Sequence, residues 1–419
     1  MKPDLAVRNI GVLATLAGPV PRTGDGMRDL GIVTDAALVS AEGRIVFAGP
    51  ARDVPPDFEE PVHRLDAGGA AVLPGFVDAH THLAFAGDRD DEIGERLAGA
   101  TYQEIAARGG GIQKTVAATR LASRDELAAA VSRHLDAMLL CGTTTAEVKS
   151  GYGLDTESEI RSLEAIVQAA AAHPVGVVPT FLGAHDVPPE HRSAPKRYVD
   201  LVVHEMIPEV ARRGLAAFAD VFCEEGAFDV SASQRILEAA ATHGLGRRVH
   251  ADELSWTGGA ELAAAVGARS ADHLIHVSPA GLGALAASGC AATLCPSAAF
   301  YLRLGRWAPA RTLIDAGVPL ALATDVNPGG GLSPSMPFAM TIACFAMGLA
   351  VAEAISAATI GGAYSIDRQD DIGSLEVGKR ADFIVLRSPR LLDLMRVGVP
   401  AIGHVVKDGR VVVREGRRA

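Results

Sequence analysis

The chain has 419 residues, 39 of them basic and 50 acidic, and its formal net charge is −11. Hydrophobic types make up 48% of it, which is typical of a well-packed globular protein and excludes disorder as the default. The acidic balance argues against nucleic acid or an anionic membrane as the main partner, and the length predicts one large domain with an appendage, or two domains.

Both ends of the chain have the pattern of short β-strands. Near the start, the pair Glu42-Gly43 predicts a tight turn between two apolar runs, and near the end the pair Asp408-Gly409 predicts another. Short hairpins are unstable alone, so we expect the two ends to pack together. The sequence therefore predicts a small β-sandwich domain built from residues 1–71 and 365–419.

Between these ends, short apolar runs alternate with helical stretches. Eight such runs over roughly three hundred residues fit an α/β fold of the (β/α)8 TIM-barrel type over residues 72–364. An open, doubly wound sheet is the alternative, and it is disfavoured because no G-x-G-x-x-G follows an early strand. The strands are expected in VLPGFVDAHTH, GTTTAEVKS, VGVVPTFLGAH, FADVFCEEG, GRRVHADE, SADHLIHV, AATLCPS and PLALATDVN, and helices at 125–140, 157–172, 231–243 and 258–266.

Several features bear on the location of the protein. Two long uncharged stretches, 274–302 and 326–352, are interrupted by Gly, Pro and Ser, so they predict buried helices and strands and no membrane span. The start, MKPDLAVRN, lacks a signal-peptide pattern because charged residues interrupt any apolar region. The five cysteines form no C-x-x-C, which is typical of reduced thiols in a cytoplasmic protein.

Polar residues at the expected strand ends indicate a site. The carboxyl ends of all strands of a (β/α)8 barrel face one mouth, where active sites form. Residues i and i+2 of a strand point to the same side, so an H-x-H motif directs both rings to one point. These residues are His80 and His82 on the first strand, His185 on the third, His250 on the fifth, His273 on the sixth and Asp325 on the eighth.

Three histidines and one aspartate form a suitable ligand set for a borderline divalent metal such as zinc or iron. Such an ion leaves a position for water and lowers the pKa of that water toward about 7. An H-x-H motif alone is more often a chance or hydrogen-bonded pair, but two further ligands at matching strand ends favour a metal. The predicted ligands are His80, His82, His250 and Asp325.

Other candidate features are weaker. GGGIQKT at 109–115 lacks the phosphate-loop spacing and predicts a flexible loop, whereas Gly329–Gly331 follow a strand end, where backbone amides can approach a ligand. Lys149, if carboxylated, or Glu224 and Glu225 are further candidate ligands or supporting groups, but a single ion is the simpler interpretation. The remaining histidines are predicted to be solvated or structural.

Several segments resemble the amidohydrolase superfamily of metal-dependent barrels. PGFVDAHTH carries the first-strand H-x-H of that superfamily, and SLEVGKRADFIVL is similar to the return of such chains into their small β domain. Longer segments, spanning nearly the whole barrel, resemble the branch that opens a nitrogen ring in histidine breakdown. They are HTHLAFAGDRDDEIGERLAGATYQEIAARGGGI, EVKSGYGLDTESEIRSL, TFLGAHDVPPE, HADELSWTGGAELAAAVGARSADHL and ATDVNPGGGLSPSMPFAM.

The resemblance implies roles for residues around the mouth. It implies that the four predicted ligands hold one zinc or iron ion and that the chain forms a homodimer. Glu253 and His273 are the candidate proton-transfer groups, although either can instead be a structural hydrogen-bonding residue. Tyr152 either contacts the substrate or anchors its loop. Substrate contacts are assigned to Arg89, Tyr152, His185, Glu253, Asn327, Gly329 and Gly330.

Arg89, in GDRDD, suits a bidentate clamp on a substrate carboxylate, and its alternative role is a loop salt bridge with Asp88 or Asp90. The chain also departs from the family pattern. Ser297 stands where glycine is expected, and Gly330 stands where a serine or threonine often contributes a contact. GGAYSIDRQDD is likewise looser than the usual version. These departures concern the finer substrate contacts and leave the metal and the reaction class unaffected.

The function implied is hydrolysis of a cyclic amide, the opening of 4-imidazolone-5-propanoate to N-formimidoyl-L-glutamate by a metal-activated water. One alternative is a relative that deaminates a heterocycle or opens another ring, which would not need Arg89. Another is a metal-binding structural or sensor protein on an inactive barrel, which would have no use for Glu253 and His273 beside the ion.

Overall fold

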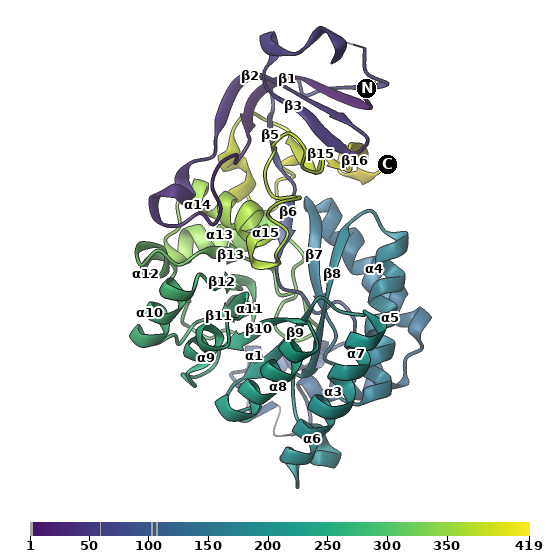
Figure 1. Ribbon diagram of the computed structural model, residues 1–419, viewed down its shortest axis with the longest axis vertical. Coiled ribbons are helices and arrows are strands. Elements are labelled where there is room, and N and C mark those ends of the chain that lie inside the picture. Colours follow the sequence, from purple (N-terminus) through teal and green to yellow (C-terminus); the bar gives the residue numbers. More distant parts are fainter. Residues whose placement is uncertain (1–2, 59, 102–103, 106–107) are drawn as a thin grey trace.

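The computed structural model describes residues 3–58, 60–101, 104–105 and 108–419, and its strands form two sheets (Figure 1). An eight-stranded parallel sheet runs in sequence order and, surrounded by helices, forms a barrel. A nine-stranded sheet, built from both ends of the chain, lies at one end of the molecule. The predicted fold class, a (β/α)8 barrel with a small β unit from both termini, is confirmed.

Each of the eight runs predicted as a barrel strand contains one strand of the parallel sheet, and the first run also contains part of β5 (Ala71–Pro74) in the terminal sheet. The strands are short and mostly buried; all seven residues of β7 are buried, for example. Strands that are covered on both faces consist of nearly continuous apolar residues, which is why they can be recognised in the sequence. They are β6 (Phe76–Asp78), β7 (Thr143–Lys149), β8 (Gly176–Ala184), β9 (Phe218–Cys223), β10 (Gly246–Ala251), β11 (Ser270–His273), β12 (Ala291–Leu294) and β13 (Leu320–Leu322).

The four helices predicted from the sequence are present, with bounds that differ by no more than one residue at either end. Ser123 and Glu126 form a capping box before α4, and Asp155 caps α5. The helices are α1 (Asp90–Leu97), α3 (Ile112–Leu121), α4 (Arg124–Leu140), α5 (Thr156–Ala172), α6 (Pro195–Leu201), α7 (Ile207–Arg213), α8 (Val230–Thr242), α9 (Gly259–Ala265), α10 (Pro279–Ser288), α11 (Pro296–Tyr301), α12 (Ala310–Asp315), α13 (Met336–Met347), α14 (Val351–Ser356) and α15 (Gly362–Ser365).

The two end strands of the parallel sheet, β6 and β13, meet through the segments that follow them. The N–H of Asp325 donates to the carbonyl of His80 at 3.0 Å, and the N–H of His82 donates to the carbonyl of Val326 at 2.8 Å. These bonds close the barrel at its carboxyl side. They also fix the backbone of three of the four predicted metal ligands relative to one another.

A glycine pair packs against both end strands. Gly361 ends the π-helical turn η6 (Ala357–Gly361), and Gly362 begins α15. A Cβ on Gly361 would lie 2.2 Å from the carbonyl oxygen of Leu320 in β13, and a Cβ on Gly362 would lie 2.3 Å from that of Val77 in β6. The helix backbone can therefore approach both strands only because these residues lack side chains.

The terminal sheet contains both predicted hairpins. Glu42 and Gly43 have φ of 51° and 74°, and Asp408 and Gly409 have φ of 48° and 71°, so both turns have two left-handed central residues as in type I′ hairpins. The two turns meet through Ala381, whose N–H donates to Gly43 and whose carbonyl accepts from Gly409. The strands are β1 (Leu5–Ala14), β2 (Ile32–Ala41), β3 (Arg44–Pro50), β4 (His63–Asp66), β5 (Ala71–Pro74), β14 (Phe383–Leu386), β15 (Ile402–Lys407), β16 (Arg410–Arg414) and β17 (Arg417–Arg418).

The chain passes from the terminal sheet into the barrel near Gly75. Strand β5 pairs with β1 and β14 in the terminal sheet, and β6 begins in the barrel at Phe76. The division of the chain into a composite domain of residues 1–71 and 365–419 and a barrel domain of residues 72–364 stays a prediction.

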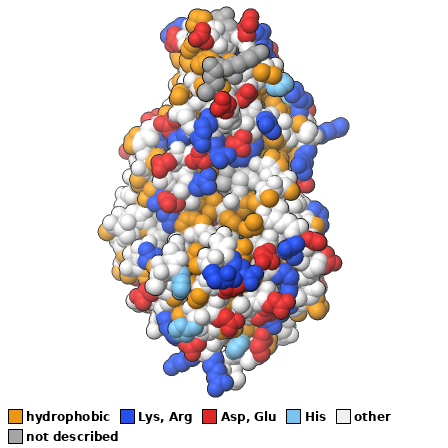
Figure 2. Space-filling model, turned by 45° about the vertical axis from the view of Figure 1, so that its right-hand side comes forward, with side chains coloured by type: hydrophobic (Ala, Val, Ile, Leu, Met, Phe, Trp, Pro, Cys, Tyr) orange, Lys and Arg blue, Asp and Glu red, His pale blue; other side chains and the backbone are white. Residues whose placement is uncertain are grey.

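On the face shown in Figure 2, acidic and basic side chains are interspersed, with apolar patches between them. Many of the charged side chains form short-range pairs, such as Arg212 and Arg213 with Glu209. Among the described residues, no helix has both the length and the apolar character needed to cross a membrane. The two long uncharged stretches form short elements, including α10 and β12 in the first and α13 in the second.

We expect Gly361→Ala to destabilise the fold by about 1–3 kcal/mol, because the added methyl group must displace the β13 backbone or the helix. The midpoint of thermal or urea unfolding measures this effect. The matched control is Gly283→Ala in α10, where a Cβ would meet no atom within 4 Å. That change should be neutral or stabilise by up to about 1 kcal/mol. Equal effects at both positions would contradict the packing role of Gly361.

Candidate active site

The carboxyl ends of the barrel strands bring the predicted site residues to one mouth, around a cavity of about 60 Å³. Most of the predicted residues line this cavity, and His80 and Gly329 adjoin it through His82 and Arg89. The lining consists of His82, Arg89, Ile112, Tyr152, His185, Phe222, His250, Glu253, Leu254, His273, Leu302, Asp325, Asn327 and Gly330.

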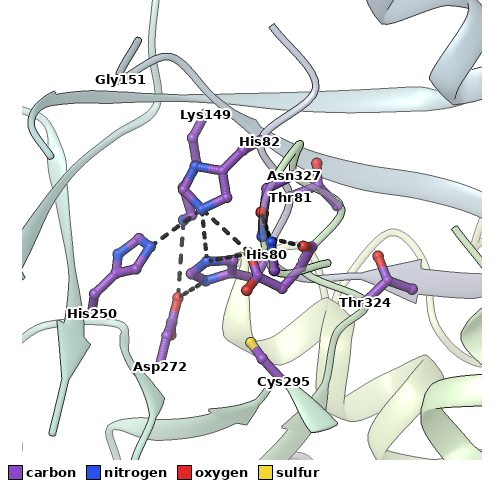
Figure 3. A network of polar contacts seen from close by, with 12 residues as sticks. His80, Thr81, His82, Lys149, Gly151, His250, Asp272, Cys295, Thr324 and Asn327 are labelled. Atoms are coloured by element: carbon purple, nitrogen blue, oxygen red, sulfur yellow. Dashed lines mark hydrogen bonds and ion pairs between the residues drawn. The ribbon is translucent and has the colours of Figure 1, made fainter. Parts of the chain in front are cut away.

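Four ligand atoms converge at the base of the cavity, where the rings of three histidines turn toward one another (Figure 3). The Nε2 atom of His82 lies 3.1 Å from that of His80 and 3.3 Å from that of His250. The Oδ1 atom of Asp325 lies 3.5 Å from Nε2 of His80 and 3.4 Å from Nε2 of His82. A tetrahedral zinc site with ordinary metal–nitrogen bonds has ligand atoms about 3.4 Å apart. The four separations are therefore close to those expected between ligands of one divalent ion.

A carboxylate lies on the far side of two of the rings and favours a proton on the nitrogen that faces it. Nδ1 of His80 lies 2.6 Å from Oδ2 of Asp272, and Nδ1 of His250 lies 3.0 Å from Oδ2 of Asp220. Nδ1 of His80 donates to the carboxylate of Asp272, and the carboxylate of Asp220 favours a proton on Nδ1 of His250, so that each ring, in its neutral form, has its lone pair on Nε2. Lone pairs that face one another repel. A cation placed between them removes this repulsion, because every lone pair can bind it.

Burial favours the neutral histidine rings that a metal site needs, but it disfavours the ionised form of Asp325, a cost that a bound cation would offset. It lowers the pKa of His80 and His82 well below the ordinary histidine value, and it raises the pKa of Asp325 to about 7. The Oδ1 atom of Asp325 is buried and has no hydrogen-bond partner among the described residues. Neutral imidazoles beside an unsatisfied carboxylate oxygen form a donor set that a divalent cation would complete.

A wholly buried layer of charged side chains supports the ligands. Nζ of Lys149 lies 2.8 Å from Asp220 and 2.9 Å from Glu147, and Arg248 lies 3.0 Å from Asp272. Burial acts to lower the pKa of Lys149, but Asp220 and Glu147 outweigh it and raise that pKa. The ammonium group therefore stays charged. A carboxylated Lys149 would bring negative charge against these carboxylates, so it does not fit this position.

Glu253 and His273 lie together beside the ligands. Nδ1 of His273 is 3.6 Å from Oε1 of Glu253, and its ring centre is 5.1 Å from that of His80. Burial raises the pKa of Glu253 well above the ordinary carboxyl value, so this group tends to hold a proton. Glu224, a candidate ligand from the sequence, instead accepts the N–H of Leu254 at 2.9 Å and so holds the loop that carries Glu253.

Arg89 is buried at the mouth and pairs with Glu92 in the first turn of α1. Its Nε and Nη2 atoms lie 2.8 and 2.7 Å from Oε2 of Glu92. The other oxygen of Glu92 accepts the N–H of Gly111 at 2.7 Å, which ties the loop before α3 to the same pair. A Cβ on Gly329 would lie 2.2 Å from Nη1, so the guanidinium fits because position 329 has no side chain.

Tyr152 and His185 form one wall of the cavity. The ring of His185 stacks on that of His82 with centroids 5.1 Å apart, and it lies 5.1 Å from the ring of Tyr152. Nδ1 of His185 is 2.9 Å from the carbonyl oxygen of Gly151, which can only accept. Burial lowers the pKa of His185 to about 3, so the ring is neutral and its Nε2 is an acceptor.

Asn327 organises the glycine loop after β13. Its amide oxygen accepts the N–H groups of Gly329 at 2.9 Å and Gly330 at 2.5 Å, and its amide nitrogen donates to the carbonyl of Asp325 at 2.8 Å. The side chain thus joins this loop to a predicted ligand. The contacts of Asn327, Gly329 and Gly330 with a substrate stay predictions, as do the catalytic roles of the other residues.

The partners of the site residues were missed by the sequence analysis, namely Glu92, Asp220 and Asp272. A signal for two of them exists, because Asp220 and Asp272 interrupt the apolar runs FADVF and SADHLI. A charge inside a buried strand needs a partner, so such interruptions indicate a buried polar network. Glu92 has no such signal, since it lies among other acidic residues on a helix.

Comparison with known proteins agrees with this geometry. The sequence profile described as "Amidohydrolase family" matches residues 71–412. The imidazolonepropionase of Symbiobacterium thermophilum is 50% identical over 422 residues, covering 100% of this chain and 99% of that protein, and the imidazolonepropionase of Geobacillus kaustophilus is 48% identical with the same coverage. A zinc-bound adenosine deaminase from Xanthomonas campestris has a TM-score of 0.70 at 19% identity, covering 99% and 94% of the two chains. The sequence relatives show the family, and the deaminase shows the fold alone.

We expect Asp220→Asn to lower zinc affinity by about 10- to 100-fold, because the neutral amide no longer supports the Nδ1–H of His250 with a charge. Competition with a chromophoric chelator measures the affinity. The control is Asp136→Asn, which changes a carboxylate 3.0 Å from His173 away from the mouth. Zinc affinity that stays at the wild-type level in Asp220→Asn would show that this pair does not support the ligand set.

Proposed function

The chain belongs to the amidohydrolase family, and we propose that it catalyses the reaction of the imidazolonepropionases, the hydrolytic opening of 4-imidazolone-5-propanoate to N-formimidoyl-L-glutamate. One observation carries the proposal. A four-donor metal set and a buried arginine, Arg89, border the same cavity, which suits a substrate with a ring amide at one end and a carboxylate at the other. The relatives named imidazolonepropionase, which match along the whole chain, support the same reaction.

The ion in this proposal is zinc or iron, since nitrogen and oxygen ligands accept both. His80, His82, His250 and Asp325 would hold it. When bound, the ion supplies a water of lowered pKa and a Lewis acid for the ring carbonyl. The task of the protein is then to orient the ring and to move protons.

Glu253 and His273 move the protons in this mechanism. His273, beside the ligands, orients the attacking water or takes its proton. Glu253, 3.6 Å from His273, gives a proton to the ring nitrogen that leaves. The raised pKa of Glu253, caused first by burial, supports its role as the acid.

The remaining residues bind the substrate. Arg89 fixes the propanoate by charge-assisted hydrogen bonds. His185 uses its Nε2 lone pair to accept a ring N–H, and Tyr152 holds a second polar atom of the ring. The glycine loop at 329–330, with Asn327, borders the product. The homodimer and the cytoplasmic location implied by the resemblance stay predictions.

The decisive test is incubation of the purified protein with fresh imidazolone propanoate, following the loss of its ultraviolet absorbance and measuring metal content on the same sample. We expect turnover with one zinc or iron per chain, and the loss of both in His80→Ala, since that variant lacks a central ligand. Full activity of a metal-free preparation would overturn the mechanism. A metal-loaded but inactive protein would favour another reaction of the family.

We expect Arg89→Met to lower kcat/KM for the propanoate substrate by about 10- to 100-fold, the worth of a charge-assisted pair. Steady-state kinetics on the propanoate and on an analogue without the carboxylate measure the difference. Only the carboxylate-bearing substrate should lose this contribution. The control is Arg212→Met, which removes an arginine from an exposed i, i+3 pair with Glu209 on the surface of α7. Equal losses on both substrates would contradict the clamp.

A further inference from the structure

A buried thiol lies next to the candidate metal site. Cys295 follows β12 and precedes α11, and only 4% of its surface is exposed. Its sulfur is 4.0 Å from the carbonyl oxygen of Thr293, which is a long contact, and it packs against Ala298 and Ala323. By sequence and packing alone, it is a small core residue.

Its surroundings give the thiol another possible role. Ligand atoms of Cys295, His80, His273 and Asp325 all lie within 4.8 Å of one another, and all four residues are buried. In Figure 3 the sulfur is the end of the Cys295 side chain nearer to the His80 ring. These four residues form a second grouping of potential ligands, which shares His80 and Asp325 with the four predicted ligands His80, His82, His250 and Asp325.

His273 is the independent sign that this grouping can bind an ion. It is 2% exposed, and neither of its ring nitrogens has a hydrogen-bond partner among the described residues. A buried imidazole of this kind keeps an unused lone pair, which costs free energy unless a ligand or an ion satisfies it. His273 therefore has a ring nitrogen that can bind an ion together with the sulfur of Cys295.

We propose that Cys295 and His273, with His80 and Asp325, form a second ligand set that takes soft, thiol-preferring ions such as cadmium. Because the two sets share two residues, one ion occupies either position at a time. Sulfur prefers soft ions, whereas the set with His82 and His250 offers only nitrogen and oxygen. On binding, the S–H proton leaves to solvent and the sulfur donates an electron pair to the ion, with no change of oxidation state.

The proposal has a consequence for catalysis. A soft ion held by Cys295 would take His273 out of proton transfer and leave His82 and His250 without their ion. The inference rests on the metal site of the proposed function but not on its substrate. Zinc binding therefore tests the shared site, and a metal–sulfur signal tests the second set.

The experiment is titration of the metal-free full chain with cadmium, following the ultraviolet charge-transfer band of a cadmium–thiolate bond. We expect the band to rise with the first equivalent in the wild type, to be absent at that equivalent in Cys295→Ser, and to persist in Cys290→Ser. Cys290 is a matched control, since it is also buried and borders the other end of β12. Cadmium affinity should fall by at least about tenfold in Cys295→Ser, while zinc affinity changes by less than about threefold.

A second variant keeps the test independent of the folding of Cys295→Ser. His273→Gln retains the thiol, so it should keep the band but bind cadmium more weakly. Wild-type protein that binds one cadmium without a thiolate band would overturn the second set, as would a full band in Cys295→Ser. Failure of the wild type to bind zinc would count against the proposed function instead.

Discussion

Closure of the barrel brings the nitrogen and oxygen atoms of the predicted ligands close together, and the other features of the site depend on these short distances. His80 and His82 come from one end of the sheet and Asp325 from the other, and two backbone hydrogen bonds of 3.0 and 2.8 Å join their segments. The donors then lie 3.1–3.5 Å apart. A fold that holds such donors at this distance is preorganised for a cation, because only positive charge turns their repulsion into attraction.

The buried charge layer satisfies a second constraint. Asp220 and Asp272 must stay ionised to orient the ligand rings, but a buried carboxylate is costly without a partner. Each of them meets a ring Nδ1–H on one side and a cation on the other, with Lys149 beside Asp220 and Arg248 beside Asp272. Burial acts to raise the pKa of Asp220, yet His250 and Lys149 outweigh it and hold that pKa well below the ordinary value. The ligand geometry therefore depends on charges that no substrate would contact.

The sequence predicted much of this site because the rules involved are local. The alternation of strands and helices identified all eight barrel strands, and the rule that strand ends share a mouth selected His80, His82, His250 and Asp325. The charges of Asp220 and Asp272 inside buried strands indicate that these residues need partners, but which residues they pair with could not be predicted, since a pair such as Asp220 with His250 depends on the register of two strands. The backbone conformation of two site residues could not be predicted from the sequence either. His273 and Asp325 have φ of 75° and 52°, a left-handed conformation that is rare for such residues and is imposed by the surrounding fold.

In the proposed function, one end of the cavity determines the class of reaction and the other end determines which substrate is recognised. The metal end is built from strand ends, which every barrel of this type has, so it defines a class of reaction. The arginine end is built from the start of α1 and two loops, and loops generally vary more among related proteins than strands do. Glu92 occupies the edge of Arg89 formed by Nε and Nη2. A Cβ at position 329 would lie 2.2 Å from Nη1 and 2.7 Å from Nη2, so the position of the Arg89 guanidinium depends on glycine there, and the proposed recognition of a carboxylate depends on both residues.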